Sequence, residues 1–343
     1  MPRLRPLFLT AILFAAGCAP LRDMPTPAAP AEPVAAASVS TPPIPTLTGR
    51  QATPLSPTSV PAASPIPALV GETVIASPSP FPTSLPTPDP SPTPCAEPGR
   101  IEFGEVNSAV AGEPMRYRIY LPPCYGSDGR VYPALYMLGG NIHDDAIWDV
   151  LGLDEAAESG ITTGQVPPLL IVMPDNGWLA NTTTSGPSSY EGFVLNELIP
   201  HIEATYCAWP AAEGRAVGGL SRGGYWSLMM AFRQPDVFLS VGAHSPALID
   251  SYAGPAEDPA ITGVTNDLGD LRIWIDIAER DPYIVQARPL HDVLESAGVP
   301  HEWHVNEGTH DEAYWRANLN SYLSWYSDGW RIDRDQLPEC ATP

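Results

Sequence analysis

Residues 215–224, RAVGGLSRGG, carry the pattern that decides the fold. A short apolar run leads into Gly219-Leu220-Ser221-Arg222-Gly223, and a helical pattern follows over residues 222–234. A strand that turns this sharply into a helix leaves little room beside its central serine, so glycines flank that residue. The pattern therefore predicts a serine at the tip of the turn with its hydroxyl exposed. This serine lies at the start of a helix, where the free backbone N–H groups and the positive end of the helix dipole stabilise negative charge that develops during a reaction.

The rest of the domain alternates short apolar runs with helical patterns, as a doubly wound, mostly parallel sheet requires. We expect strands at residues 133–138, 168–173, 215–218, 238–243, 271–278 and 301–306, and helices at 145–157, 192–206, 222–234, 285–297 and 311–326. Residues 100–107 and 115–121 predict an antiparallel hairpin at the edge of this sheet. The fold class is therefore α/β.

Proline divides the chain into two unlike parts. Of 43 prolines in 343 residues, 22 fall within residues 19–98, among mostly Ala, Ser and Thr. Proline removes backbone donors, and so little apolar content cannot form a core, so we expect a disordered, extended linker there. Residues 99–343 then form one α/β domain, which is long enough for a sizeable core.

The first 18 residues resemble a bacterial lipoprotein signal. Arg3 and Arg5 precede a short apolar stretch that ends in Ala15-Ala16-Gly17-Cys18, too short to span a bilayer stably. We expect lipidation of Cys18 and an anchored protein at the extracytoplasmic bacterial cell surface. The alternative is an ordinary secretory signal with a chance cysteine.

The charge restricts the partners. The formal net charge is −22, and the sequence has no lysine. Such a field repels phosphates and anionic membranes, so we expect no nucleic acid partner and membrane contact only through the lipid anchor.

Four further cysteines, an even number in an exported chain, predict two disulfides. Folding the hairpin about the middle of its turn brings Cys124 opposite residue 97, which favours Cys95–Cys124 and leaves Cys207–Cys340. The cysteine spacing lacks C-x-x-C and a nearby histidine pair, so no metal is expected.

A nucleophilic serine needs a base, and in this architecture the chain order is serine, acid, histidine. Among the seven histidines, His310 lies past a strand end and before the final helix. It is the predicted base. Asp281, which follows the strand over residues 271–278, is favoured as the acid over Asp276 and Glu279.

An oxyanion hole needs two backbone donors. One is the N–H of Arg222, directly after the nucleophile, and the other is expected at Asn141 or Ile142. Gly140 is a candidate substrate-binding residue, because glycine lets the backbone of this loop approach the substrate closely.

Several motifs together resemble the Putative esterase family of α/β-hydrolases. They are YPALYMLGG, ELIPHIEATY, RAVGGLSRGGYWSL, IDIAERDPY and GTHDEAYWRANL, within residues 100–330. The family includes esterase D, feruloyl and acetylxylan esterases and mycolyltransferases. The resemblance implies an α/β-hydrolase fold and a triad at Ser221, Asp281 and His310, with no cofactor. One departure is Gly139-Gly140, where the family often has His-Gly.

The expected activity is hydrolysis of a small-molecule or glycan-linked carboxylic ester through an acyl-enzyme. Trp178 and Tyr190 in the loop 177–190, together with His244, are candidate substrate-binding residues. The two aromatic residues could equally pack that loop against the domain. Two other functions stay open: acyl transfer to a sugar or lipid alcohol, and a catalytically silent surface protein that binds cell-wall glycan or a protein partner.

Overall fold

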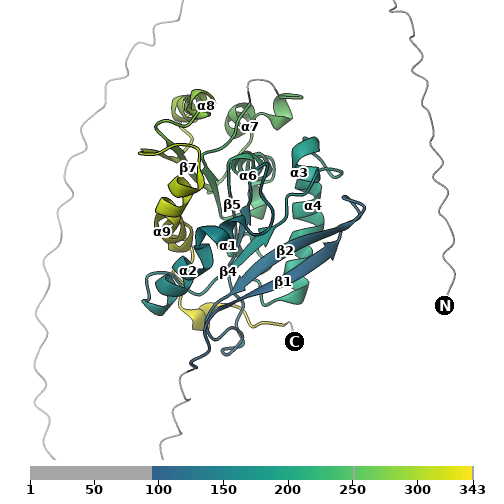
Figure 1. Cartoon of the computed structure of the whole chain (residues 1–343), viewed down its shortest axis with the longest axis vertical. Coiled ribbons are helices and arrows are strands. Elements are labelled where there is room, and N and C mark those ends of the chain that lie inside the picture. The colour runs from purple at the N-terminus through teal and green to yellow at the C-terminus, as the bar shows by residue number, and fades with distance from the viewer. Residues whose placement is uncertain (1–94, 250–251, 342–343) are drawn as a thin grey trace, which may run out of the picture. The chain divides into compact units, whose positions relative to one another are not determined.

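An eight-stranded sheet forms the centre of the part of the chain that the computed structural model describes, residues 95–249 and 252–341. Its strands are β1 (Arg100–Asn107), β2 (Pro114–Leu121), β3 (Ala134–Leu138), β4 (Leu170–Pro174), β5 (Arg215–Leu220), β6 (Ser240–His244), β7 (Arg272–Ala278) and β8 (Glu302–Asn306). Their order in the sheet is β1-β2-β4-β3-β5-β6-β7-β8. Six neighbouring strands, β4, β3, β5, β6, β7 and β8, run parallel to one another. At one edge, β2 is antiparallel to β4, and β1 is antiparallel to β2. The predicted fold class is confirmed (Figure 1).

The edge hairpin has the register that the sequence predicts. Arg100 pairs with Leu121, and the Cys124 N–H donates to the carbonyl of Glu97 at 3.2 Å. This register places Cys95 beside Cys124, and the two form a disulfide.

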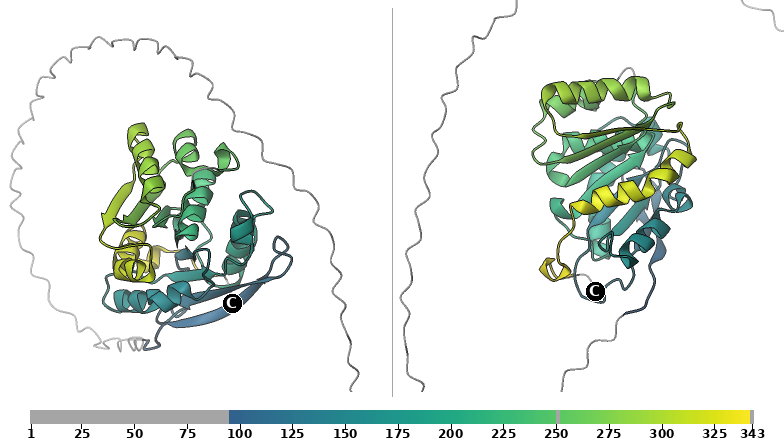
Figure 2. Two further views of the ribbon diagram at one scale, coloured as in Figure 1. Left: turned by 45° about the horizontal axis from the view of Figure 1, so that its top comes forward. Right: turned by 90° about the vertical axis from the view of Figure 1, so that its left-hand side faces the viewer.

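Helices cover both faces of the sheet. On one face lie α1 (Ile147–Leu151), α2 (Leu153–Thr162) and α9 (Glu312–Asp328). On the other lie α3 (Leu179–Thr182), α4 (Tyr190–Phe193), α5 (Ile199–Thr205), α6 (Arg222–Arg233), α7 (Pro259–Thr265) and α8 (Ile284–Ala297). Figure 2 shows α8 and α9 on opposite sides of the sheet edge that β7 and β8 form. Each face buries its own apolar cluster, so the sheet is covered on both sides, as its continuous apolar strands require.

Two predicted helices are interrupted. Gly152, with φ of 92°, separates α1 from α2. In the segment 192–206, a π-helical turn at Val194–Leu198 joins α4 to α5. Pro200 lacks the N–H that a regular helix would use there, which accounts for the widened turn just before it.

Shorter helical turns lie at Ala212–Gly214, Pro235–Val237, Pro255–Glu257 and Arg334–Gln336. The helix α7 was not expected from the sequence. It begins with Asp258 as its cap, whose side chain accepts a hydrogen bond from the Ala260 N–H at 2.9 Å. Pro259 occupies the first position of the helix, where a missing N–H costs nothing.

The C-terminal segment is held against residues that precede β3 and against the residues that follow α5. Cys207 and Cys340 form the second disulfide, across 133 residues of sequence. Arg130 forms an isolated bridge with Glu339, and Tyr132 forms another with Ala208. Both predicted cysteine pairings are therefore present.

The predicted signal at residues 1–18, with Cys18, and the linker as far as residue 94 lie outside the described residues. Among the helices that are described, none has both the length and the apolar character needed to cross a membrane.

Candidate active site

Ser221 occupies the tight turn between β5 and α6. Its φ of 55° is in the left-handed region, an unusual conformation for a residue with a side chain. A Cβ on Gly219 would lie 2.5 Å from the carbonyl carbon of Gly223, and one on Gly223 would lie 2.4 Å from the oxygen of Leu138. Both flanking glycines are therefore required by contact with backbone, as the sequence pattern predicts.

The backbone of Ser221 is held on both sides. Its N–H donates to the carbonyl of His244 at 3.0 Å, and its carbonyl accepts from the N–H of Ala247 at 2.9 Å. These bonds join the turn to the end of β6 and the residues after it. They stabilise the strained conformation and fix the direction of the serine side chain.

The three predicted catalytic side chains lie in hydrogen-bonding contact. The Nε2 of His310 is 2.9 Å from the Oγ of Ser221, and its Nδ1 is 2.7 Å from Oδ2 of Asp281. The Asp281 side chain is fully buried, while that of His310 keeps 18% of its surface exposed. The arrangement has the geometry of a nucleophile, a base and an orienting acid.

Asp281 and His310 come from adjacent loops after β7 and β8. The loops are joined because the N–H of Glu279 donates to the carbonyl of Asn306 at 2.8 Å, and that of Arg280 donates to Gly308 at 3.3 Å. The second oxygen of Asp281 accepts from the N–H of Tyr283 at 2.8 Å, so both carboxylate oxygens are engaged.

The two other candidate acids face elsewhere. Glu279 is exposed and pairs with Arg280. Asp276 is buried and pairs with His244. Neither is bonded to His310, so the contacts favour Asp281, the acid that the sequence favours.

A cavity of about 600 Å³ opens onto Ser221 and His310. It is lined by Asn141, Ile142, His143, Ser221, Tyr283, His310, Asp311, Glu312, Ala313 and Trp315. Its walls therefore combine aromatic surface with two carboxylates at the start of α9.

The predicted oxyanion donors border this cavity. Asn141 and Ile142 line it, and Ile142 is 91% exposed. Arg222 begins α6, where backbone N–H groups have no partner within the helix. The Nε–H of its side chain donates a hydrogen bond to the carbonyl of Ala180 at 3.3 Å.

Gly140 supports this loop and does not line the cavity. Its N–H donates to Nδ1 of His143 at 3.3 Å, and its carbonyl accepts from the side chain of Asn176 at 2.9 Å. A Cβ here would lie 3.2 Å from the Cβ of Ser221, so glycine permits the close approach. The structure gives no support for the predicted contact of Gly140 with substrate, because this residue is not among those that line the cavity.

Sequence reasoning missed the groups that hold the loop 139–142. Buried Asn176 bridges the Gly140 carbonyl and the hydroxyl of Tyr190, which donates at 2.8 Å. Asn181 donates to the carbonyl of Asn141 at 2.8 Å. Burial lowers the pKa of His143, which favours the neutral ring that can accept from Gly140. Position in a loop after a strand was the only signal available for these residues.

The candidate substrate-binding residues Trp178, Tyr190 and His244 do not line the cavity at Ser221, and Tyr190 instead packs its loop against the domain, which is the alternative that the sequence left open. Tyr190 and His244 have no exposed surface, because each packs in the core and bonds to other buried side chains. Trp178 is 48% exposed, but it does not line the cavity at Ser221, and its indole N–H donates to Glu113 at 3.0 Å.

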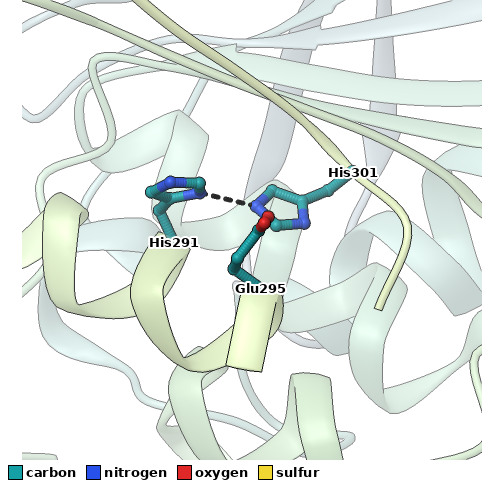
Figure 3. Close-up of side chains that lie close together, drawn as sticks. All are labelled: His291, Glu295 and His301. Carbon is teal, nitrogen blue, oxygen red and sulfur yellow. Dashed lines mark hydrogen bonds between the residues drawn. The ribbon is translucent and has the colours of Figure 1, made fainter. Parts of the chain in front are cut away.

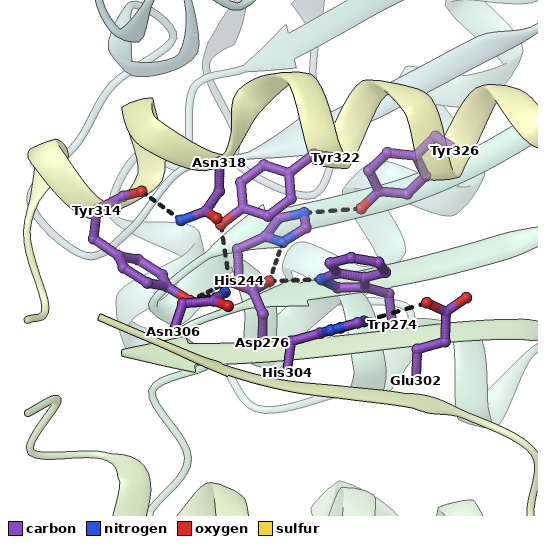
Figure 4. A network of polar contacts seen from close by, with 10 residues as sticks. All are labelled: His244, Trp274, Asp276, Glu302, His304, Asn306, Tyr314, Asn318, Tyr322 and Tyr326. Atoms are coloured by element: carbon purple, nitrogen blue, oxygen red, sulfur yellow. Dashed lines mark hydrogen bonds and ion pairs between the residues drawn. The ribbon is translucent and has the colours of Figure 1, made fainter. Parts of the chain in front are cut away.

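His244 belongs to a buried polar network around Asp276 (Figure 4). One Asp276 oxygen accepts from His244 at 2.6 Å and Trp274 at 2.8 Å. The other accepts from the hydroxyls of Tyr314 at 2.7 Å and Tyr322 at 2.9 Å. This carboxylate is therefore satisfied by four donors in an environment without exposed surface.

The aromatic residues of α9 complete the network. The hydroxyl of Tyr326 lies 3.1 Å from Nε2 of His244, and the Tyr322 ring stacks on the His244 imidazole. Burial raises the pKa values of Tyr322 and Tyr326, so both remain protonated. A Cβ on Gly218 or Gly242 would lie 1.9 Å from the Tyr326 oxygen, so these glycines admit that hydroxyl to the sheet.

Comparison with known proteins identifies the family to which the chain belongs. The family model described as Putative esterase matches residues 108–326, well over half of the chain. The chain belongs to this esterase family. The resemblance drawn from the sequence motifs is therefore confirmed.

Two relatives of this chain are named as esterases and match part of its length. An esterase of Mycobacterium tuberculosis is 29% identical over 252 residues, which are 59% of this chain and 54% of that protein. An endo-1,4-beta-xylanase/feruloyl esterase of Xylanibacter ruminicola is 27% identical over 230 residues, covering 62% of this chain and 29% of the relative. The chain thus spans about half the length of the mycobacterial relative and less of the other.

Solved structures of the same fold include a ferulic acid esterase, with a TM-score of 0.61 and 24% identity over 69% of this chain and 100% of that one. An S-formylglutathione hydrolase of Staphylococcus aureus has a TM-score of 0.59 and 18% identity, over 68% of this chain and 99% of that one. At these identities the likeness establishes the α/β-hydrolase fold.

Proposed function

We propose that this protein is a serine esterase that hydrolyses a carboxylic ester through Ser221, His310 and Asp281. The observation that carries the proposal is the continuous pair of contacts from Ser221 Oγ to His310 Nε2 at 2.9 Å and from His310 Nδ1 to Asp281 at 2.7 Å. The family match supports ester chemistry, and the cavity provides space for an acyl group beside the serine.

In the first half of the reaction, Ser221 Oγ forms a bond to the ester carbonyl carbon while its proton moves to Nε2 of His310. The carbonyl oxygen becomes negative and is bound by the N–H of Arg222 and one N–H from Asn141 or Ile142. The bond to the alcohol oxygen then breaks, and His310 returns the proton to that oxygen. An acyl-enzyme on Ser221 and a free alcohol result.

In the second half, His310 takes a proton from a water molecule, whose oxygen bonds to the acyl carbon. The bond to Ser221 breaks, the serine regains its proton from His310, and the carboxylic acid leaves. Asp281 does not change protonation. It holds the Nδ1 proton in place and stabilises the imidazolium that forms twice per turnover.

The cavity favours an ester with an apolar or aromatic acyl group. Trp315 and Tyr283 pack around His310, with ring centroids 5.1 and 4.9 Å from its ring, and Ile142 adds exposed apolar surface. Asp311 and Glu312 at the rim disfavour anionic substrates. Hydrolysis of methyl ferulate, p-nitrophenyl acetate and S-formylglutathione, compared by kcat/KM, tests this preference. A preference for the anionic glutathione thioester would contradict it.

A fluorophosphonate probe tests the nucleophile. We expect stoichiometric labelling of the wild type at Ser221, located by peptide mass spectrometry, and none in Ser221→Ala. Ser188 is exposed in the loop before α4, so Ser188→Ala is the matched control and should label like the wild type. Wild-type protein that folds but does not label would overturn the proposal.

We also propose that residues 1–18 direct export, that Cys18 carries the lipid anchor and that the linker 19–98 holds the esterase domain outside the membrane. Two disulfides in the described residues support an oxidising compartment. Metabolic labelling with palmitate in a bacterial host should mark the full chain and fail for Cys18→Ala. Equal labelling of both would refute the anchor.

A further inference from the structure

Two histidines and a glutamate converge where α8 ends and the chain turns into β8 (Figure 3). His291 and Glu295 are four residues apart on α8, hence on one face of the helix, and His301 directly precedes β8. One potential ligand atom from each residue lies within 4.8 Å of the others. None of these side chains takes part in the proposed reaction.

We propose that His291, Glu295 and His301 bind a divalent transition-metal ion, with Zn²⁺ as the expected occupant. Two imidazoles and one carboxylate form a ligand set that zinc prefers, with a water molecule left to complete a tetrahedron. The proposal is independent of the esterase activity. The expectation of no metal rested on the spacing of the cysteines, and this site contains no cysteine.

The hydrogen bonds of His301 leave a nitrogen lone pair directed at the cluster. Its Nδ1 lies 2.8 Å from the carbonyl oxygen of Val299, which can only accept, so Nδ1 carries the ring proton. In the neutral ring, Nε2 is then unprotonated, and it faces Nδ1 of His291 at 2.8 Å. A metal-binding imidazole commonly has this arrangement, with its other nitrogen donating to a carbonyl.

Without a metal, His291 Nδ1 donates a hydrogen bond to His301 Nε2. To bind a metal, the His291 proton moves to the other ring nitrogen, which changes the tautomer and leaves the ring charge unchanged. Zinc–nitrogen bonds of about 2.0–2.1 Å in a tetrahedron place two ligand nitrogens about 3.3 Å apart. The two rings therefore need to separate by about half an ångström from their 2.8 Å contact.

Packing restricts both rings while the carboxylate remains free to adjust. The His291 ring stacks on Trp303, with ring planes 5° apart and centroids at 4.8 Å. His301 is fixed through Val299, and both histidines are partly buried. Glu295 is exposed, so its side chain can rotate toward the ion at small cost.

The site lies away from the reacting atoms. Tyr283, which lines the catalytic cavity, precedes α8, and His291 follows it by eight residues, a rise of about 12 Å along a helix. A metal here would join the end of α8 to the start of β8 across Gly298. We therefore expect it to raise stability and to leave the esterase kinetics unchanged.

Zinc binding to chelator-treated protein without a histidine tag, measured by isothermal titration calorimetry, tests the site. The wild type should bind one Zn²⁺ and show a rise in Tm, and Co²⁺ should give the visible absorption of a tetrahedral site. His291→Ala and His301→Ala should each weaken binding by at least about 100-fold. Glu295→Gln, an exposed substitution that cannot disturb the core, should weaken it by at least about 10-fold.

Two controls separate this site from others that contain histidine. His304 is a partly exposed histidine beside Glu302, and His310 belongs to the catalytic site. His304→Ala and His310→Ala should retain the one-site isotherm and the Tm rise. Absence of saturable binding by the folded wild type, or binding that survives in His291→Ala and His301→Ala, would overturn the proposal.

Discussion

Nδ1 of His244 lies 2.6 Å from Oδ1 of Asp276, in a pair that joins β6 to β7 and is fully enclosed by the fold. The main-chain carbonyl of the same histidine accepts the N–H of Ser221. The described residues thus include two buried carboxylates that each pair with a histidine, Asp276 with His244 and Asp281 with His310. In the second pair, His310 lines the cavity and contacts the side chain of the nucleophile. In the first pair, His244 supports the backbone of the nucleophile.

Asp276→Asn should destabilise the domain strongly. The amide would place a donor where donors already converge on both carboxylate oxygens, at a cost of about 3 kcal/mol in the free energy of unfolding. Urea unfolding measures it. Asp270→Asn, at an exposed position before β7, is the control and should unfold like the wild type. Equal stabilities would show that the network is dispensable.

Gly219→Ala should prevent the turn at Ser221 from forming as it does here. The added methyl would lie 2.5 Å from the backbone of Gly223, and two main-chain segments cannot separate without moving the serine. We expect poor folding or a loss of kcat of at least about 100-fold. Gly254→Ala, where the nearest atom is the flexible carboxylate of Glu257 at 3.0 Å, should behave like the wild type.

His143 should make stability sensitive to acid. Burial lowers its pKa, against smaller opposing effects of Glu312 and Asp144. The native state therefore binds fewer protons than the unfolded chain, whose histidine titrates near 6.5. The contribution of neutral His143 to the free energy of unfolding is therefore present above that pH, and it is lost as the pH falls through the lower pKa of the native state.

NMR titration of the His143 ring and urea unfolding between pH 5 and 8 test this prediction, with the pH range set about the ordinary histidine pKa. In His143→Gln, the free energy of unfolding should fall less on going to acid pH than it does in the wild type. A native pKa at or above the ordinary value would contradict the proposed neutral acceptor for Gly140.

The two disulfides should contribute unequally. Loop entropy gives about 5 kcal/mol for Cys207–Cys340, which spans 133 residues, and about 4 kcal/mol for Cys95–Cys124, which spans 29. The double variants Cys207→Ala/Cys340→Ala and Cys95→Ala/Cys124→Ala can be compared by Tm. A larger fall in Tm on removing Cys95–Cys124 than on removing Cys207–Cys340 would show that local strain or packing outweighs the entropy of loop closure.

The sequence was sufficient for features set by local chemistry. The turn at Ser221 needs small neighbours, and the register of the edge hairpin follows from counting residues across its turn. The histidine and acid could be assigned because parallel strands end at the same edge of a sheet, which brings Asp281 and His310 near Ser221.

The errors arose where burial depends on distant parts of the chain. His244 reads as a residue on a loop rim, yet Tyr322 and Tyr326 of α9, about 80 residues later, enclose it. Tyr190 is buried for a similar reason, against Trp226 of α6. Nothing in the sequence pairs His291 with His301, because only the turn between α8 and β8 brings these two side chains together.

The most direct test is detection of the covalent acyl intermediate. Turnover of p-nitrophenyl butyrate, quenched by acid during the initial burst, should give an intact mass increased by one butyryl group, located on Ser221 by peptide mapping. Asp281→Asn should lower the rate of acylation by about 10⁴-fold while leaving the fold intact. Ester turnover by wild-type protein without a serine adduct, or unchanged turnover in Ser221→Ala, would contradict the account.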